Sequence, residues 1–229
     1  MADIIIHKVS IICHYSQQGY VQMRKGVWMD RKLFVFDVGG VVIYNNPIIE
    51  EFCEKYGLEF RSVFRDWMGY HNPLMEGYLS VTTFLEMIEN KYNIDLHGDN
   101  AMLSCYHPRE IPAVTEMVRR LRQNGHRVVT GSNTFDVHWE KLKNMTPSPL
   151  RDFDKLYASH EIHLSKPDHA FYYYIMKAES FEPSNSFFID DMEKNVQAAR
   201  DVGMTAYKYD GNDSQLLEFL SPYLEKDYK

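Results

Sequence analysis

Four short runs of mostly apolar residues predict the strands of one sheet. They lie at residues 33–36, 127–130, 186–189 and 205–209. Runs without polar alternation are typical of strands buried on both faces, as in parallel sheets. The first three runs are followed by acidic or polar residues. The sequence therefore predicts a covered parallel sheet with polar side chains at its carboxyl edge.

The segments between the later strands have helical spacing of apolar residues. One such segment begins at Pro112, keeps one apolar face up to Leu121 and ends at Gly125. Proline suits the first turn of a helix, and glycine suits the position after its end. A further helix around Val196 ends at Gly203. Alternating strands and helices predict an α/β fold, a Rossmann-like parallel sheet sandwiched by helices.

The stretch between the first two strands is too long for a single crossover helix and predicts an inserted helical domain. One helix is expected from Asn46 and Pro47 to Gly57, and another after the capping residue Ser80. We therefore predict a core of residues 31–44 and 109–229, a small helical cap domain of residues 45–108, and an N-terminal extension of residues 1–30. An insert at this point lies over the strand ends, where open α/β sheets bind ligands.

Composition narrows the function classes. The net charge of −7 provides no basic field for a phosphate backbone, so nucleic acid is not an expected partner. Apolar runs near the N-terminus are too short to cross a bilayer, so no membrane partner is expected. Three cysteines at wide spacing predict neither a disulfide framework nor a zinc site, which favours the cytoplasm. Nothing in the sequence sets the oligomeric state.

Chemistry-bearing residues follow the strands in four clusters. Any one cluster is common in turns, helix caps or solvated surfaces. On neighbouring parallel strands they would converge on one crevice with acids, a hydroxyl and one ammonium, which is typical of a phosphate and metal site. The clusters are Asp37 to Gly40, Ser132 with Asn133, Lys166, and Asp190 with Asp191.

As an ordered set, these clusters resemble the four motifs of the haloacid dehalogenase-like superfamily. The matching stretches are 36–42, 129–134, 164–167 and 187–191, and the resemblance covers roughly residues 33 to 209. The insert is similar to the helical cap of that superfamily. The paired glycines of the first motif and the Ser-Asn-Thr of the second most resemble the branch of the glucose-1-phosphate phosphatases.

The resemblance implies a Mg²⁺-dependent phosphatase of small phosphorylated metabolites, sugar 1-phosphates among them. Asp37 is then the nucleophile that forms an aspartyl phosphate. Magnesium is implied between the carboxylates of Asp37 and Asp191 and the carbonyl of Gly39, with Asp190 in or near that ligand set. A hard cation prefers such oxygen ligands.

The same resemblance implies how the phosphoryl group is bound. Lys166 is expected to neutralise its charge and to orient the nucleophile. Ser132 and the backbone N–H groups around Gly39, Gly40 and Asn133 are expected to bind its oxygens.

One position departs from the pattern of the superfamily. Its phosphatases place a second aspartate two residues after the nucleophile, where this chain has Gly39. That aspartate is the general acid and base, a role worth roughly 100- to 10,000-fold in rate. Its absence leaves three interpretations open: an inactive scaffold, a poor catalyst, or a substrate with an easily displaced leaving group such as an anomeric phosphate.

Two alternatives to the phosphatase follow from this departure. A metal-independent haloacid dehalogenase also lacks the second aspartate, but the paired Asp190 and Asp191 beside Asp37 would repel one another without a cation. A noncatalytic binding module would have little reason to keep a costly cluster of buried charges.

The cap is expected to select the substrate. We predict that residues 67–73 form a loop between two cap helices and face the site. His71 is the candidate substrate-binding residue in it and a possible replacement for the missing acid and base, with an ordinary loop histidine as the alternative.

Overall fold

The computed structural model describes residues 23–24, 27–28 and 31–224. Strands β1 (Met23–Arg24) and β2 (Val27–Trp28) pair antiparallel as a short ribbon. The rest of the predicted extension at residues 1–30 lies outside the described part of the chain.

The central sheet has four parallel strands, as the apolar runs predicted. They are ordered β4-β3-β5-β6, so β3 and β5 occupy the middle. Phe36 at the end of β3 is level with Thr130 on one side and Ile189 on the other. The residues that follow these three strands therefore begin at the same edge of the sheet. The strands are β3 (Leu33–Phe36), β4 (Arg127–Thr130), β5 (Ser186–Asp190) and β6 (Thr205–Lys208).

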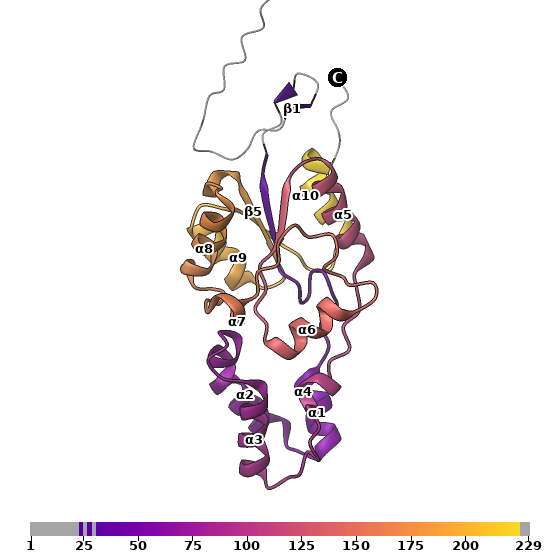
Figure 1. Cartoon of the computed structure of the whole chain (residues 1–229), viewed down its shortest axis with the longest axis vertical. Coiled ribbons are helices and arrows are strands. Elements are labelled where there is room, and N and C mark those ends of the chain that lie inside the picture. Colours follow the sequence, from indigo (N-terminus) through magenta and orange to yellow (C-terminus); the bar gives the residue numbers. More distant parts are fainter. Residues whose placement is uncertain (1–22, 25–26, 29–30, 225–229) are drawn as a thin grey trace, which may run out of the picture.

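Helices cover both faces of the sheet (Figure 1). Helices α5 (Pro112–Gln123) and α10 (Asp213–Leu224) pack on the face that carries Phe34 and Phe36. Helices α8 (His169–Glu179) and α9 (Glu193–Asp201) pack on the face that carries Leu33 and Val35. This alternation of side chains along a strand buried on both sides produces a three-layer sandwich. The prediction of a Rossmann-like α/β fold is confirmed.

Shorter elements connect these layers. Helix α6 (Asp136–Asn144) follows β4, α7 (Ser159–Ile162) precedes the loop of Lys166, and the 3₁₀ helix η1 (Pro183–Asn185) precedes β5. Lys155 and Ala158 form isolated parallel bridges with Val129 and Ser132. The segment that contains Lys155 and Ala158 therefore runs beside β4 and extends the sheet without forming a regular strand.

Four helices between β3 and β4 form a group beyond the carboxyl edge of the sheet (Figure 1). They enclose a hydrophobic cluster of their own, which includes Phe52, Phe84 and Met102 and also receives Phe135 from the loop after β4. The helices are α1 (Ile48–Tyr56), α2 (Phe60–Met75), α3 (Val81–Tyr92) and α4 (Ala101–Ser104).

Several helix ends agree with the capping residues in the sequence. The Ser80 hydroxyl accepts a hydrogen bond from the Thr83 N–H at the start of α3. Gly57 follows α1 with a left-handed backbone, φ +66°. Pro112 is the first residue of α5.

The predicted loop at residues 67–73 is wrong, because this segment lies inside helix α2. The carboxylate of Glu59 caps the helix by accepting from the N–H groups of Arg61 and Ser62. Pro73 lies in the last turn, and the helix continues past it with a bond from the Glu76 N–H to the Asn72 carbonyl. A proline near a helix end disturbs only one backbone bond, so it does not stop this helix.

A matched pair of glycines tests the packing at the end of β4. A Cβ on Gly131 would lie 2.6 Å from Cγ1 of Val35, whereas one on Gly69 in α2 meets nothing within 4 Å. We expect Gly131→Ala to lower the free energy of unfolding by about 1–3 kcal/mol through overpacking. Gly69→Ala should raise it by about 0.5–1 kcal/mol through helix propensity. Urea unfolding followed by circular dichroism measures both, and equal effects would contradict the close approach of β4 to β3.

Candidate active site

Asp37 is the first residue beyond β3 and is almost fully buried, with 8% of its surface exposed. Its backbone N–H donates to the carbonyl of Ile189 over 2.8 Å, which joins it to β5. Its Oδ1 accepts from the N–H of Val38 over 2.7 Å. The backbone of the nucleophile candidate is therefore fixed by β5, and its carboxylate by the N–H of the next residue, at the carboxyl edge of the sheet.

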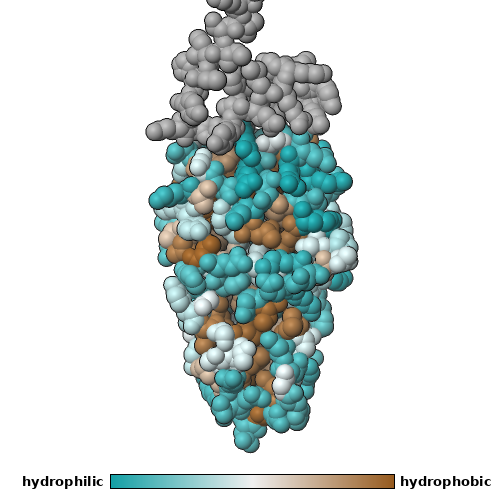
Figure 2. Space-filling model, in the orientation of Figure 1, coloured by the Kyte–Doolittle hydropathy of each residue, from teal (hydrophilic) through white to brown (hydrophobic). Residues whose placement is uncertain are grey.

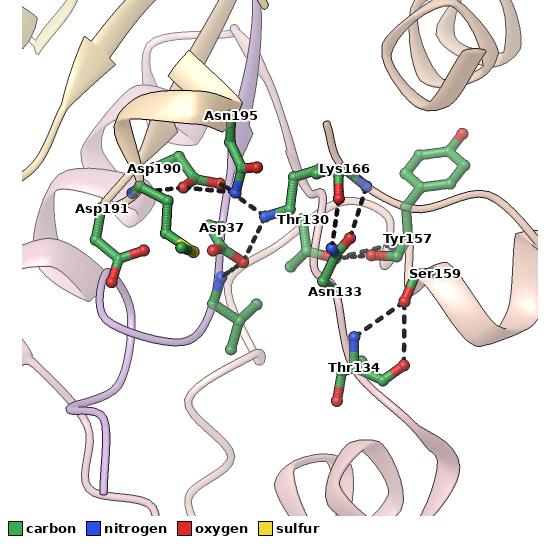
Figure 3. Close-up of polar contacts among 12 residues, drawn as sticks. Asp37, Thr130, Asn133, Thr134, Tyr157, Ser159, Lys166, Asp190, Asp191 and Asn195 are labelled. Carbon is green, nitrogen blue, oxygen red and sulfur yellow. Dashed lines mark hydrogen bonds and ion pairs between the residues drawn. The ribbon is translucent and has the colours of Figure 1, made fainter. Parts of the chain in front are cut away.

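Lys166 connects two of the acids (Figure 3). Its Nζ lies 2.9 Å from Oδ1 of Asp37 and 2.7 Å from Oδ2 of Asp190, and its side chain is entirely buried. The Asn133 side chain holds the backbone of this lysine from both sides. Its Nδ2 donates to the Lys166 carbonyl and its Oδ1 accepts from the Lys166 N–H, each over 2.9 Å.

The two neighbouring acids at the end of β5 have different surroundings. Asp190 is fully buried and both its oxygens accept hydrogen bonds, from the N–H of Met192, from Nδ2 of Asn195 and from Lys166. Asp191 is half-buried and accepts from Nδ2 of Asn45 over 3.2 Å. Asp191 therefore keeps more free acceptor capacity than Asp190.

Burial and charge strongly disturb the ionisation of this group. Burial raises the pKa of Asp37 to about 8, with Lys166 opposing the shift and the two other acids adding to it. Burial also raises the pKa of Asp191, with Asp190 adding to the effect. Burial alone would lower the pKa of Lys166, but the carboxylates of Asp190 and Asp37 outweigh it and hold the pKa above its usual value. The ammonium stays charged.

The acid group fits a divalent cation. One oxygen of each of Asp37, Asp190 and Asp191 lies within 4.8 Å of the others, and one ammonium leaves two negative charges unbalanced. Carboxylate oxygens are the ligands that Mg²⁺ prefers. Such an ion would oppose both causes of the raised pKa values of Asp37 and Asp191, which are burial first and the charge of neighbouring acids second.

Gly40 is required by space and by backbone conformation. Its φ is +72°, and a Cβ there would lie 2.2 Å from Oδ2 of Asp191 and 2.7 Å from Nδ2 of Asn45. Its N–H donates to the carbonyl of Ile43 over 2.8 Å. Gly40 therefore gives the acids room, but its N–H is already used within the turn and is not free for a phosphoryl oxygen, contrary to the sequence-based expectation.

Gly39 has a polar neighbour where a side chain would begin. A Cβ on it would lie 3.2 Å from Oδ1 of Asn45. The amide of Asn45 thus lies beside both glycines and beside Asp191. This amide occupies part of the space that a second aspartate would need.

The loop after β4 brings Ser132 to the same edge of the sheet. Its N–H donates to the carbonyl of Tyr157 and its carbonyl accepts from the N–H of Ser159. The Ser159 hydroxyl in turn accepts from the N–H of Thr134 (Figure 3). Ser132 is buried. The two backbone hydrogen bonds to Tyr157 and Ser159 hold it in place.

His71 lies on α2, and no described hydrogen bond or ion pair joins it to the acids. Its ring contacts Trp67 edge-on, with centroids 5.9 Å apart. Burial lowers its pKa, Asn72 opposes the shift and Lys194 of α9 adds to it, so the imidazole is neutral near pH 7. Its role toward substrate stays a prediction.

Sequence reasoning missed two polar residues that organise the site, Asn195 and Asn45, and it anticipated Asn133 through its backbone N–H but not through the side chain that fixes Lys166. Asn195 holds Asp190, Asn45 contacts Asp191, and the side chain of Asn133 fixes Lys166. The sequence signal for Asn195 is a polar residue beside the apolar positions of the helix that follows Asp190, at a position expected to be buried. Asn45 carries no such indication, because its contact depends on how the loop after β3 folds.

Comparison with known proteins decides the family. A sequence profile of the haloacid dehalogenase-like hydrolases matches residues 35–208. The chain belongs to this family. The family predicted from the ordered motifs is thereby confirmed, whereas the branch of the glucose-1-phosphate phosphatases stays a prediction.

Two relatives of this hydrolase are named phosphatases. A D-ribitol-5-phosphate phosphatase from Bacteroides thetaiotaomicron is 25% identical over 189 residues, which cover 77% of this chain and 91% of that protein. A sesquiterpene phosphatase from Aspergillus oryzae is 24% identical over 176 residues, which cover 76% of this chain and 87% of that protein.

Solved structures agree on the fold. A haloacid dehalogenase family enzyme from Bacteroides thetaiotaomicron superposes with a TM-score of 0.72 at 24% identity, covering 82% of this chain and 98% of that chain. The same enzyme in complex with magnesium and inorganic phosphate gives a TM-score of 0.68 at 24% identity, over 80% of this chain and 96% of that chain.

The raised pKa of Asp37 predicts a pH-dependent cost to stability without metal. Between its unfolded pKa near 4 and its folded pKa of about 8, the folded chain binds more protons, so stability falls as pH rises. We expect Asp37→Asn to abolish this loss. In chelator its advantage over the unmodified protein should grow from pH 4 to pH 8, by at most about 1.4 kcal/mol per pH unit.

Urea unfolding at pH 5 and pH 8 measures the effect, with the exposed Asp210→Asn as a matched control. An advantage of Asp37→Asn that is the same at both pH values would contradict the raised pKa.

Proposed function

We propose that this hydrolase is a Mg²⁺-dependent phosphatase that hydrolyses small phosphate monoesters through an aspartyl phosphate on Asp37. The observation that carries the proposal is the buried ammonium of Lys166, which contacts Asp37 and Asp190 while Asp191 keeps acceptor capacity beside them. This arrangement supports the proposal because two carboxylates and one buried ammonium lie beside Asp37 at one edge of the sheet.

The first chemical step follows from these positions. A carboxylate oxygen of Asp37 attacks phosphorus, the Asp37 oxygen–phosphorus bond forms, and the bond from phosphorus to the leaving oxygen breaks. Lys166 stays charged and stabilises the negative phosphoryl oxygens. The Ser132 hydroxyl and nearby backbone N–H groups, those of Gly39 and Asn133 among them, are proposed as further donors. In the second step, a water oxygen attacks phosphorus, the bond between phosphorus and the Asp37 oxygen breaks, and inorganic phosphate and the Asp37 carboxylate are released as the water gives up a proton to solvent.

The metal ligands are proposed as Asp37, Asp191 and the carbonyl of Gly39. Magnesium bound there would neutralise charge on the phosphoryl group and allow the anionic nucleophile to approach it. Asp190 is proposed as a positioning residue that holds Lys166 in place. Its oxygens already accept hydrogen bonds from Lys166, from Asn195 and from the N–H of Met192. The sequence-based expectation placed Asp190 in or near the ligand set, and we propose that it lies beside the metal ligands.

The named relatives support phosphatase chemistry, and the magnesium and phosphate complex of the structural neighbour supports the choice of metal. No helix in the described part of the chain is long and apolar enough to span a bilayer. Cys53 and Cys105 are both free and buried thiols, which supports a reducing compartment such as the cytoplasm.

The proposed mechanism requires both Asp37 and a divalent cation. Asp37→Asn should lower phosphate release from acetyl phosphate by at least about 1,000-fold, as expected when a covalent nucleophile is removed. Excess chelator should do the same to the unmodified protein, and added magnesium should restore it. Tyr173→Phe, at an exposed position on α8, serves as the control. Full activity of Asp37→Asn would eliminate the mechanism.

The absence of an acid at position 39 predicts the order of substrates. Acyl, aryl and anomeric phosphates should be hydrolysed faster than phosphates of primary alcohols, because their leaving groups need no protonation. Aryl phosphates should give a burst followed by a slower steady rate, since water attack on the aspartyl phosphate also lacks a base. Rapid mixing with p-nitrophenyl phosphate measures the burst.

Restoring the acid gives the matching variant. Gly39→Asp should increase hydrolysis of alkyl phosphates, and the increase should be larger in combination with Asn45→Ala, which removes the amide 3.2 Å from the new Cβ. Equal rates for all leaving groups without a burst would mean that another residue is the acid and base. His71→Ala would then show whether His71 has that role.

A further inference from the structure

A cavity lies between the cap helices and the loop that follows β4. Its volume is about 260 Å³, and it is lined from the cap by α1 and α2 and from the core by Asn133 and Thr134. Figure 2 shows hydrophobic surface on this part of the molecule, over the region of α1 and α2. The apolar side chains that line the cavity are Ile48, Ile49, Phe64, Trp67, Met75 and Phe135.

The cavity adjoins the proposed phosphate site through Asn133. This residue lines the cavity, and its amide makes both hydrogen bonds that fix the backbone of Lys166. Asn133 is therefore common to the lining of the cavity and to the contacts that hold the segment of Lys166.

The polar groups around the cavity are mostly engaged within the protein. Nε2 of His138 contacts the carbonyl of Met102 over 2.9 Å, and burial lowers the pKa of this histidine to about 4, so it is neutral. Nδ2 of Asn46 donates to the carbonyl of Cys105. Oδ1 of Asn46 is buried without a partner in the described residues, and Glu50 lies at the exposed rim. Apart from Oδ1 of Asn46 and the carboxylate of Glu50, the cavity thus offers a ligand few polar partners.

This lining separates two kinds of leaving group. A polyol placed here would bury several hydroxyls against aromatic and aliphatic side chains, and each unpaired hydroxyl costs about 1–3 kcal/mol. An apolar group gains from the same burial. Trp67 and Phe135 already meet edge to face with ring centroids 5.8 Å apart, an arrangement that favours a further flat ring.

We infer that this cavity binds the leaving group of the substrate and selects phosphate monoesters of apolar alcohols over phosphorylated polyols. The inference rests on the proposed phosphatase and specifies its substrate class. It departs from the polyol substrate in the name of the Bacteroides relative. Phe64 is the specificity residue that best reports on it, since it lines the cavity from α2 and is 42% exposed, so its replacement leaves the cap core intact.

Competition between two five-carbon phosphates tests the inference. Both n-pentyl phosphate and ribitol 5-phosphate are esters of primary alcohols, so they differ in hydroxyls and not in the type of leaving group. Against hydrolysis of acetyl phosphate with magnesium, n-pentyl phosphate should inhibit at least about ten-fold more strongly than ribitol 5-phosphate. A stronger or equal effect of ribitol 5-phosphate overturns the inference.

Variants of two phenylalanines on one helix provide the second measurement. Phe64→Ser should lower kcat/KM for phenyl phosphate by roughly ten- to a hundred-fold while leaving acetyl phosphate unchanged, because an acetyl group does not fill the cavity. Phe60→Ser is the matched control, since Phe60 stacks on Phe64 at 5.3 Å with 37% exposure but does not line the cavity. Equal losses in both variants overturn the inference.

The apolar group of the substrate is an aryl or an isoprenoid group. Inhibition of acetyl phosphate hydrolysis by phenyl phosphate and by isopentenyl phosphate, each with magnesium, distinguishes the two. Preference for either of them over ribitol 5-phosphate supports the inference. Hydrolysis of acetyl phosphate without any apolar preference overturns the inference alone. Absence of acetyl phosphate hydrolysis with magnesium overturns the proposed function and the inference together.

Discussion

The contact of one buried ammonium with two buried carboxylates is the constraint on which this site depends. Lys166 lies between Asp37 and Asp190 with no exposure of its side chain. An unpaired charge at this depth would cost several kcal/mol, so the ions persist only where their partners are held within hydrogen-bond distance. The central pairing of β3 with β5 supplies that condition, because Phe36 and Ile189 are level and the acids that follow them are therefore neighbours.

Two asparagine side chains hold these charged groups within hydrogen-bond distance of one another. Asn195 satisfies Asp190 from α9, and Asn133 fixes the backbone of Lys166 from the loop after β4. Burial of Asp37, together with the sharing of one ammonium among three acids, is unfavourable for folding, and both raise the pKa of Asp37. Perturbed acids of this kind are typical of functional sites, where stability is given up for a charge arrangement that a cation and a phosphoryl group complete.

The sequence predicted the sheet and its acidic edge because both depend on local patterns. Runs such as 33–36 are apolar over their whole length, and an acid that follows a parallel strand has one possible edge to occupy. Helix α2 was missed because Gly69 and Pro73 suggest a loop, whereas the cap at Glu59 and packing against α1 and α3 maintain a helix. The contact of Asn45 with Asp191 spans 146 positions and follows no periodicity.

Helix α2 connects the apolar cavity with the charged group. Phe64, Trp67 and Met75 of α2 line the cavity. Directly after Met75, Glu76 accepts a hydrogen bond from the Ser165 hydroxyl over 2.7 Å, next to Lys166. The carbonyl of Glu76 also contacts Nδ1 of His163 over 2.7 Å. Helix α2 therefore lines the cavity and also contacts the segment that carries Lys166. The two parts of the proposed site consequently share one helix, so a change in the position of α2 would alter the cavity lining and the support of the buried ammonium together.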